Sequence, residues 1–172
     1  DFDASLLYES IPDFHNTRKR FNNLKAAVAA NKSGRADSVK KEIEFALSYE
    51  KYVDAITNGI ADKTVPLRVT HNDTKLNNIL FDPKTKKCLS VIDLDTVMPG
   101  SMLYDYGDAL RFGASSAKED ETDLGTVFCC MDKFEAFTKG FISEVKDSIA
   151  PAEIELMPLS VLLMTYECGI RF

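Results

Sequence analysis

Hydrophobic residues recur at helical spacing through the first third of the chain. The pattern predicts a helix over residues 14–28 and a second helix over residues 39–56, which ends at Asn58-Gly59. Asp13 or Thr17 could cap the first helix at its N-terminus, because a short polar side chain there can accept a free backbone N–H.

The middle of the chain changes to short apolar runs typical of strands. Residues 67–70, 78–81 and 88–92 each form such a run. The residues between the second and third runs, 82–87, are turn formers and lysines. We therefore expect a β-hairpin whose basic tip is a solvated turn rather than a nucleic-acid-binding patch.

Helical spacing returns after Pro99-Gly100. It predicts a short helix over residues 104–112, a long one over residues 121–147 and a last one from Pro151 onward, which Pro158 should kink or delay. The predicted fold class is mainly α with a small β-hairpin insert, that is, α+β.

Composition and charge exclude several classes of protein. The chain has 172 residues, 45% of them hydrophobic and 28% charged, which is ordinary for a globular domain, and its net charge of −6 argues against binding to nucleic acid. No apolar run is long enough to cross a membrane, and the first residues lack the features of a signal peptide, so we expect a cytoplasmic protein. With no C-x-x-C pair and only two histidines, a zinc site is not expected, and the cysteines should be reduced thiols: Cys88, Cys129, Cys130 and Cys168.

The candidate chemistry lies between residues 71 and 95. Folding the hairpin about its turn places Asn78 opposite Ile92 or Asp93. The preceding loop leads into the same open end, so Asp73 should lie close by, with Lys75 alongside. The sequence thus predicts two carboxylates, an amide and an ammonium group at one rim.

Phosphoryl transfer requires a set of this kind. Mg²⁺ takes oxygen ligands and needs only one or two carboxylates beside phosphate and water, so Asn78 and Asp93 fit as ligands. A hydroxyl nucleophile needs a carboxylate to orient it and accept its proton, which suits Asp73. Lys75 could balance charge on the transferred group.

The same residues carry a family resemblance. The spacing H-x-D-x-x-x-x-N, an Asp after an apolar strand, and the following I-D-x-x-x-x-x-P-G and Y-D resemble the protein-kinase-like small-molecule phosphotransferases of the aminoglycoside phosphotransferase and choline kinase type. The strings T-H-N-D-T-K-L-N-N and Y-G-D-A-L-R-F-G are most similar to bacterial N-acetylhexosamine 1-kinases.

The resemblance implies a two-lobed kinase using ATP and Mg²⁺. Residues 1–172 would be its C-terminal catalytic lobe, and the N-terminal nucleotide-binding lobe, with its glycine-rich loop and strand Lys, is absent from this chain. Asp73 would be the catalytic base, Asn78 and Asp93 the metal ligands, and Lys75 would lie near the γ-phosphate. The resemblance further implies that His71 braces the catalytic loop and that Asp105 holds it from below, and that the isolated lobe is inactive.

Other candidate residues have more than one interpretation. Asp95 is a second metal ligand, a substrate contact or simply an exposed loop carboxylate. Asp108 and Arg111 form an i,i+3 surface ion pair or recognise sugar hydroxyls. His15 has no predicted role.

The expected reaction is phosphorylation of the anomeric 1-hydroxyl of an N-acetylhexosamine. The alternative acceptors are an aminoglycoside, choline, homoserine or a thiosugar, and for a cationic acceptor the chain offers an acidic cluster at Glu119, Asp120, Glu121 and Asp123. A second alternative is a non-catalytic binding module that keeps the shape of a kinase lobe.

Overall fold

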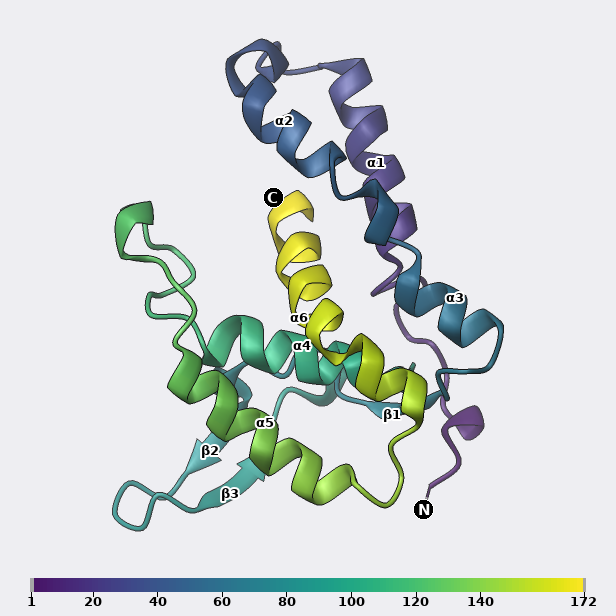
Figure 1. Ribbon diagram of the computed structural model, residues 1–172, viewed down its shortest axis with the longest axis vertical. Coiled ribbons are helices and arrows are strands. Elements are labelled where there is room, and N and C mark those ends of the chain that lie inside the picture. The colour runs from purple at the N-terminus through teal and green to yellow at the C-terminus, as the bar shows by residue number, and fades with distance from the viewer. Residues whose placement is uncertain (1, 172) are drawn as a thin grey trace.

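A computed structural model describes residues 2–171. Two helices, α4 and α6, cross at its centre, α1 and α2 extend to one end, and the β2–β3 hairpin projects from the other (Figure 1). The helices are α1 (Thr17–Ala30), α2 (Lys40–Leu47), α3 (Ala55–Ala61), α4 (Met102–Gly113), α5 (Met131–Val145) and α6 (Pro151–Arg171). The strands are β1 (Arg68–Thr70), β2 (Ile79–Phe81), β3 (Cys88–Val91) and β4 (Met98–Gly100). The predicted fold class, mainly α with a small hairpin, is confirmed.

The first helix starts later than predicted. Its N-cap is Asn16, whose side chain accepts the Lys19 N–H at 2.9 Å, so both suggested caps were wrong. Asp13 has a φ of 60° and lies in the turn before the helix, where it instead accepts hydrogen from the Asn16 side chain and pairs with Lys19. An N-cap residue needs an extended backbone, which Asp13 does not have.

The second predicted helix is broken into two helices. Between α2 and α3 the Ser48 hydroxyl donates to the Phe45 carbonyl at 2.7 Å, and a 3-10 turn follows at Glu50–Tyr52. A serine hydroxyl that satisfies a nearby carbonyl competes with helix continuation. The break lets Val53 and Ile56 become almost completely buried in the core.

The long helix predicted over residues 121–147 was also wrong in its first part, because α5 begins only at Met131. The residues before it fold back on the end of α4. The Ser116 N–H donates to the Phe128 carbonyl at 3.0 Å, and the Cys130 N–H donates to the Ala114 carbonyl at 2.7 Å. Leu124, Val127 and Phe128, whose spacing suggested a helix face, are therefore exposed.

The last helix runs unbroken from Pro151 to Arg171 across Pro158, so Pro158 does not delay its start. Pro151 suits the first turn, where its missing N–H has no helical partner in any case. Within residues 2–171, no helix has both the length and the hydropathy to cross a bilayer. The four cysteines are free thiols, as predicted.

The hairpin is confirmed, and a second strand pair forms a separate two-stranded sheet. In the hairpin, Ile79 pairs with Val91 and the Ile92 N–H donates to the Asn78 carbonyl at 2.9 Å. The predicted strand near Leu67 pairs with β4, a strand the sequence did not predict, with Arg68 opposite Gly100. A side chain at Gly100 would come within 2.4 Å of the Thr70 hydroxyl, so glycine is required there.

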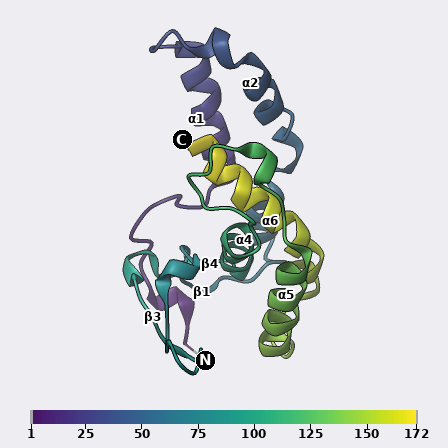
Figure 2. The same ribbon diagram turned by 90° about the vertical axis from the view of Figure 1, so that its left-hand side faces the viewer.

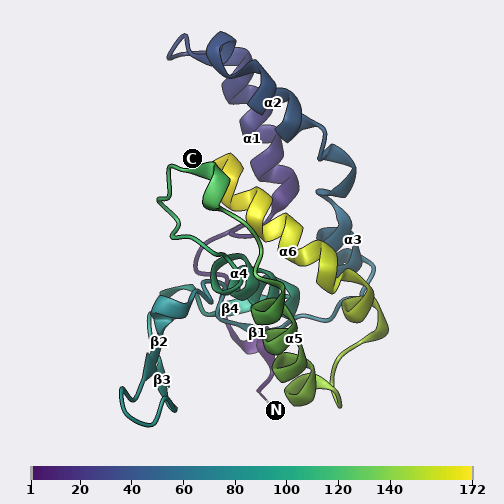
Figure 3. The same cartoon turned by 60° about the vertical axis from the view of Figure 1, so that its left-hand side comes forward.

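The core lies between α4 and α6, which Figures 2 and 3 show crossing closely, with α5 packed alongside. At the crossing, a Cβ added to Gly107 would lie 2.6 Å from the Ser160 carbonyl oxygen. The absence of a side chain at Gly107 lets the two helices approach, and Leu103 and Leu163 belong to the buried cluster between them. This rigid pair supports the loop that follows β1.

Candidate active site

The candidate site is built on the loop that joins β1 to β2, residues 71–78. The backbone of Asn72 has a φ of 65°, a left-handed conformation that asparagine tolerates better than most residues. The Asn72 side chain donates to the Thr96 carbonyl at 3.0 Å, and the Thr96 hydroxyl donates to the His71 carbonyl at 2.6 Å. The loop is therefore fixed against the segment that follows the hairpin.

Asp105, on the first turn of α4, holds this loop from the protein interior. Its carboxylate accepts the backbone N–H of His71 at 2.9 Å and that of Asn72 at 2.7 Å. Its own carbonyl accepts the Thr74 hydroxyl at 2.6 Å. Burial raises the pKa of Asp105, while the two backbone N–H groups oppose the rise.

His71 braces the loop from the other side. Its Nε2 lies 3.0 Å from the Ile92 carbonyl, and its Nδ1 receives the Asp73 N–H at 3.3 Å. A ring that donates through one nitrogen and accepts through the other is neutral. The His71 side chain thus links the hairpin end to the backbone of Asp73 and lies where it can support the loop.

Asp73, Lys75 and Asn78 are brought together as predicted. The Lys75 ammonium lies 2.9 Å from Asp73 Oδ2, and the Asn78 side-chain NH₂ donates to the same oxygen at 3.0 Å and to the Asp73 carbonyl at 2.8 Å. The hydrogen bond to Asp73 raises the pKa of Lys75, and burial opposes the rise. Among the described residues both side-chain contacts fall on Oδ2, so Oδ1 is the oxygen left to receive a hydroxyl.

Asn78 and Asp93 offer oxygen donors of the kind that a hard cation prefers. Asn78 is buried and its nitrogen is committed to Asp73, so its Oδ1 is the atom that can face a cation. Asp93 is exposed at the hairpin end with a φ of 62°, and it is close enough to contribute to the raised pKa of Lys75. Within residues 2–171 no three acidic, histidine or cysteine side chains cluster as a metal cage. The donor set fits an ion such as Mg²⁺ that keeps phosphate and water ligands.

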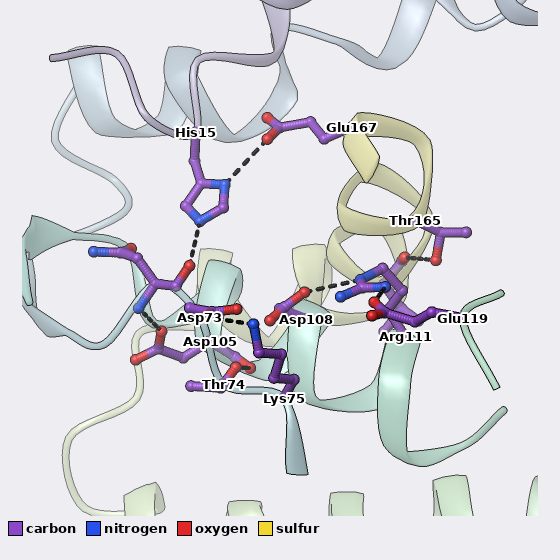
Figure 4. A network of polar contacts seen from close by, with 12 residues as sticks. His15, Asp73, Thr74, Lys75, Asp105, Asp108, Arg111, Glu119, Thr165 and Glu167 are labelled. Carbon is purple, nitrogen blue, oxygen red and sulfur yellow. Dashed lines mark hydrogen bonds and ion pairs between the residues drawn. The ribbon is translucent and has the colours of Figure 1, made fainter. Parts of the chain in front are cut away.

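Asp108 and Arg111 lie on the next two turns of α4 and form the ion pair expected from their spacing. Arg111 Nε contacts Asp108 Oδ1 at 2.8 Å, and Arg111 Nη1 contacts Glu119 at 2.6 Å (Figure 4). Burial alone would lower the pKa of Arg111, but Asp108 and Glu119 raise it above its ordinary value. The pair is mostly buried rather than solvated, and Asp108 Oδ2 has no hydrogen-bond partner among the described residues.

A cavity of about 680 Å³ opens beside Asp73 and Arg111. Its charged lining residues are Asp73, Lys75, Arg111, Lys118, Glu119, Asp120, Glu121 and Arg171. A second hollow of about 50 Å³ connects Asp73 with Asp108 and Arg111. Asp95, by contrast, is exposed on a 3-10 turn and lies outside the lining of both cavities.

Two residues that support the site could not be identified from sequence. His15 and Glu167, far apart in the chain, contact each other at 3.0 Å, and the other His15 nitrogen contacts the Asn72 carbonyl at 3.0 Å (Figure 4). His15 thus has a structural position that its sequence context did not predict. No local pattern could have revealed it, because its partners are 57 and 152 residues away.

Comparisons with known proteins bear on the chain as a whole. The sequence model of the phosphotransferase enzyme family (APH) matches residues 4–127. A solved structure, described as the crystal structure of an aminoglycoside-3'-phosphotransferase of type VIII, matches 96% of this chain with 18% sequence identity and a TM-score of 0.44. The match covers 54% of that protein, so this chain spans about half of its length.

Proposed function

The chain belongs to the phosphotransferase enzyme family, and from that premise we propose that it forms the catalytic lobe of an ATP- and Mg²⁺-dependent kinase that phosphorylates a hydroxyl group of a small molecule. The proposal rests on the position of Asp73, which its loop fixes at the edge of a cavity and of whose two carboxylate oxygens only Oδ2 contacts other side chains of residues 2–171.

Asp73 would orient the acceptor hydroxyl and take its proton as the hydroxyl oxygen bonds to the γ-phosphorus of ATP, while the bond from that phosphorus to the bridging oxygen breaks and ADP leaves. Its Oδ2 is already held by Lys75 and Asn78, which supports Oδ1 as the proton acceptor. Because the loop is fixed by Asp105, the carboxylate needs little reorganisation when the acceptor binds. Positioning of this kind supplies much of the rate in phosphoryl transfer.

Asn78 and Asp93 would hold Mg²⁺ through their side-chain oxygens. When bound, the ion would neutralise negative charge on the nucleotide phosphates. Lys75 would bring a further positive charge close to the transferred group, since it already lies beside Asp73 at the mouth of the cavity. His71 and Asp105 would act by keeping this loop in place.

The acceptor we propose is a neutral sugar, an N-acetylhexosamine phosphorylated on its 1-hydroxyl. The 680 Å³ cavity is lined by four acidic and four basic side chains, and two of the acidic ones are paired, Asp73 with Lys75 and Glu119 with Arg111. A balanced lining favours a neutral polyhydroxy acceptor over a polycation. Asp108 Oδ2, which has no hydrogen-bond partner within the described part of the chain, would accept a hydroxyl hydrogen at the edge of this space, and Arg111 would donate to an acceptor oxygen.

Other acceptors remain as alternatives to be tested. An aminoglycoside or choline would require the acidic side chains at Glu119, Asp120 and Glu121 to turn toward a cation, and Asp123 does not line the cavity. Homoserine or a thiosugar would be phosphorylated on a hydroxyl group by the same mechanism. A non-catalytic module is less well supported, because Asp73, Asn78 and Asp93 are all present and Asp73 is tied to Asn78.

The two-lobe arrangement is part of the proposal. Residues 1–172 would be the C-terminal lobe, and a glycine-rich nucleotide-binding lobe would come from a segment outside this chain. ATP held only at Asn78 and Asp93 would be weakly bound, so residues 1–172 alone should turn over ATP slowly.

The test is acceptor-dependent ADP formation by the full-length protein, with Mg-ATP and a panel of N-acetylhexosamines, aminoglycosides, choline, homoserine and thiosugars. Asp73→Asn should lower kcat by roughly 10²–10⁴-fold on the preferred acceptor, since the amide cannot take the proton. Its nucleotide affinity should stay close to that of the wild type. Asp82→Asn, at the hairpin tip, is the control and should retain full turnover. Turnover that survives Asp73→Asn would contradict the role of Asp73.

A further inference from the structure

His15 lies in the interior between the N-terminal segment and the active-site loop. Its side chain is about 10% exposed and packs against Tyr104 on α4, with the two ring centroids 4.9 Å apart and the rings tilted by 32°. One ring nitrogen, Nδ1, is 3.0 Å from the Glu167 carboxylate on α6, and the other, Nε2, is 3.0 Å from the Asn72 carbonyl oxygen. The ring therefore bridges α6 and the residue directly before Asp73.

Both partners of the ring are hydrogen-bond acceptors. A backbone carbonyl can only accept, and an ionised carboxylate can only accept. Glu167 is buried and is surrounded by donors, because its Oε1 accepts the Thr17 hydroxyl at 2.6 Å and Arg20 Nε lies 3.4 Å from its Oε2. Both Glu167 oxygens therefore face side-chain donors and act as acceptors. The geometry thus calls for an N–H on each ring nitrogen of His15.

The bridged carbonyl is well placed to affect Asp73. The Asn72 carbonyl belongs to the peptide plane that also carries the Asp73 N–H, which donates to His71. Asn72 has the left-handed φ of 65°, so its backbone has to be held by its contacts. Asp105 holds the N–H of Asn72, and His15 holds the carbonyl. Without His15 the peptide plane before Asp73 could rotate, and the carboxylate would move with it.

We propose that His15, carrying a proton on both ring nitrogens and anchored by Glu167, is a positioning residue that sets the orientation of Asp73. The proposal rests on the proposed role of Asp73 as the catalytic base. Among the described residues, the other charged or titratable side chains that contact the His15 ring or line the cavities beside it are Glu9, Asp13, Arg20, Asp73, Tyr104, Asp105, Asp108, Arg111, Cys168 and Arg171.

The experiment compares His15→Phe with wild type in the full-length protein. Phenylalanine keeps the packing against Tyr104 but cannot donate a hydrogen bond. Displacement of a reacting group by about 1 Å can cost 10²-fold, so we expect kcat to fall by roughly 10- to 100-fold, with the KM values for Mg-ATP and acceptor nearly unchanged. Tyr166→Phe is the matched control, because it also removes one α6 hydrogen bond, from the Tyr166 hydroxyl to the Ala46 carbonyl, at a point away from the loop. It should lower the melting temperature to a similar extent and leave kcat unchanged.

A second measurement reads the protonation of the ring without using activity. The measurement is ¹⁵N NMR of histidine-labelled protein at pH 7. The ring-nitrogen signals that are present in the wild type and missing in His15→Phe belong to His15, and they should be those of two protonated nitrogens. His71 donates through Nε2 and accepts through Nδ1, so it should report one N–H and serves as the internal reference.

The outcomes separate this inference from the proposed function. A kcat loss in His15→Phe without a KM change, a doubly protonated His15 and an inactive Asp73→Asn together support it. A singly protonated His15 overturns the proposed anchoring, and unchanged kcat in His15→Phe overturns the positioning role, while an inactive Asp73→Asn would still support the function. If Asp73→Asn remains active, the proposed function fails, and the positioning role fails with it.

Discussion

Asp105→Ala should destabilise the protein strongly, because it removes the acceptor of two buried backbone N–H groups. Hydrogen bonds to a charged group contribute about 1.5–3 kcal/mol each, so the bonds to His71 and Asn72 give about 3–6 kcal/mol. Burial raises the pKa of Asp105, which means that the ionised carboxylate carries a desolvation cost that alanine avoids. After this offset we expect the free energy of unfolding to fall by about 2–4 kcal/mol.

The assay is equilibrium unfolding in urea, followed by far-UV circular dichroism. With a slope of about 2 kcal/mol per molar urea, the midpoint should fall by about 1–2 M. Asp82→Ala is the control, because Asp82 also accepts two backbone N–H groups, from Lys84 and Thr85, but at the solvated hairpin tip. Its midpoint should move much less. Equal midpoints for Asp105→Ala and wild type would refute the view that this carboxylate holds the loop.

The same residue predicts a pH dependence. The folded-state pKa of Asp105 is raised, so its protonated form is favoured by folding. The part of its contribution that depends on pH should be fully present below the unfolded-state pKa, about 3.9, and should be lost as the pH rises through the folded-state pKa, which leaves the hydrogen bonds from His71 and Asn72 to the ionised carboxylate. The stability of the wild type minus that of Asp105→Asn should therefore decrease from pH 4 upward. An increase over this range would contradict the direction of the shift.

Two further predictions test the metal site and the helix crossing. Asp93→Ala should abolish the Mg²⁺-dependence of nucleotide binding in a calorimetric titration and leave the melting temperature nearly unchanged, because Asp93 is exposed. Normal Mg-nucleotide binding together with a lower melting temperature would show that Asp93 has a structural role instead. Gly107→Ala should lower stability by about 1–3 kcal/mol or more, since its Cβ would lie 2.6 Å from the Ser160 carbonyl, whereas Gly113→Ala, with no atom within 4 Å, should be neutral or stabilising in the same thermal melt.

The hairpin and the cluster at its open end could be predicted from sequence because both depend on short-range geometry. A turn of known composition sets the register, and the register places Asn78 opposite Ile92. Asp73 lies only five residues before Asn78, so the chain has little freedom to separate the two side chains. The central chemistry of the site is local in this sense.

Helix boundaries were less predictable because tertiary and side-chain contacts decide them. The apolar spacing around Leu124 and Val127 is helical, yet Ser116 and Ala114 satisfy backbone groups nearby and the segment forms a loop instead. At the break after α2, the Ser48 hydroxyl likewise donates to a nearby carbonyl, that of Phe45. Periodicity cannot weigh such contacts against a helical hydrogen bond.

The parts of the site that the sequence did not predict are long-range. The β1–β4 pair brings Arg68 opposite Gly100, and the His15–Glu167 contact joins the two ends of the chain. Neither leaves a periodic or motif signal. The ion pair of Asp108 and Arg111 was predicted from its spacing, but its burial follows from the packing of α4.

Asp73 is proposed to serve the transfer of a phosphoryl group from ATP to a hydroxyl of a neutral sugar. The most direct test of this role is ³¹P NMR of the products formed by the full-length protein from Mg-ATP and an N-acetylhexosamine. We predict a resonance coupled to the anomeric proton, that of a sugar 1-phosphate, which is missing with Asp73→Asn. Formation of the same product by Asp73→Asn at a rate close to that of the wild type, or release of inorganic phosphate alone by the wild type, would contradict this role.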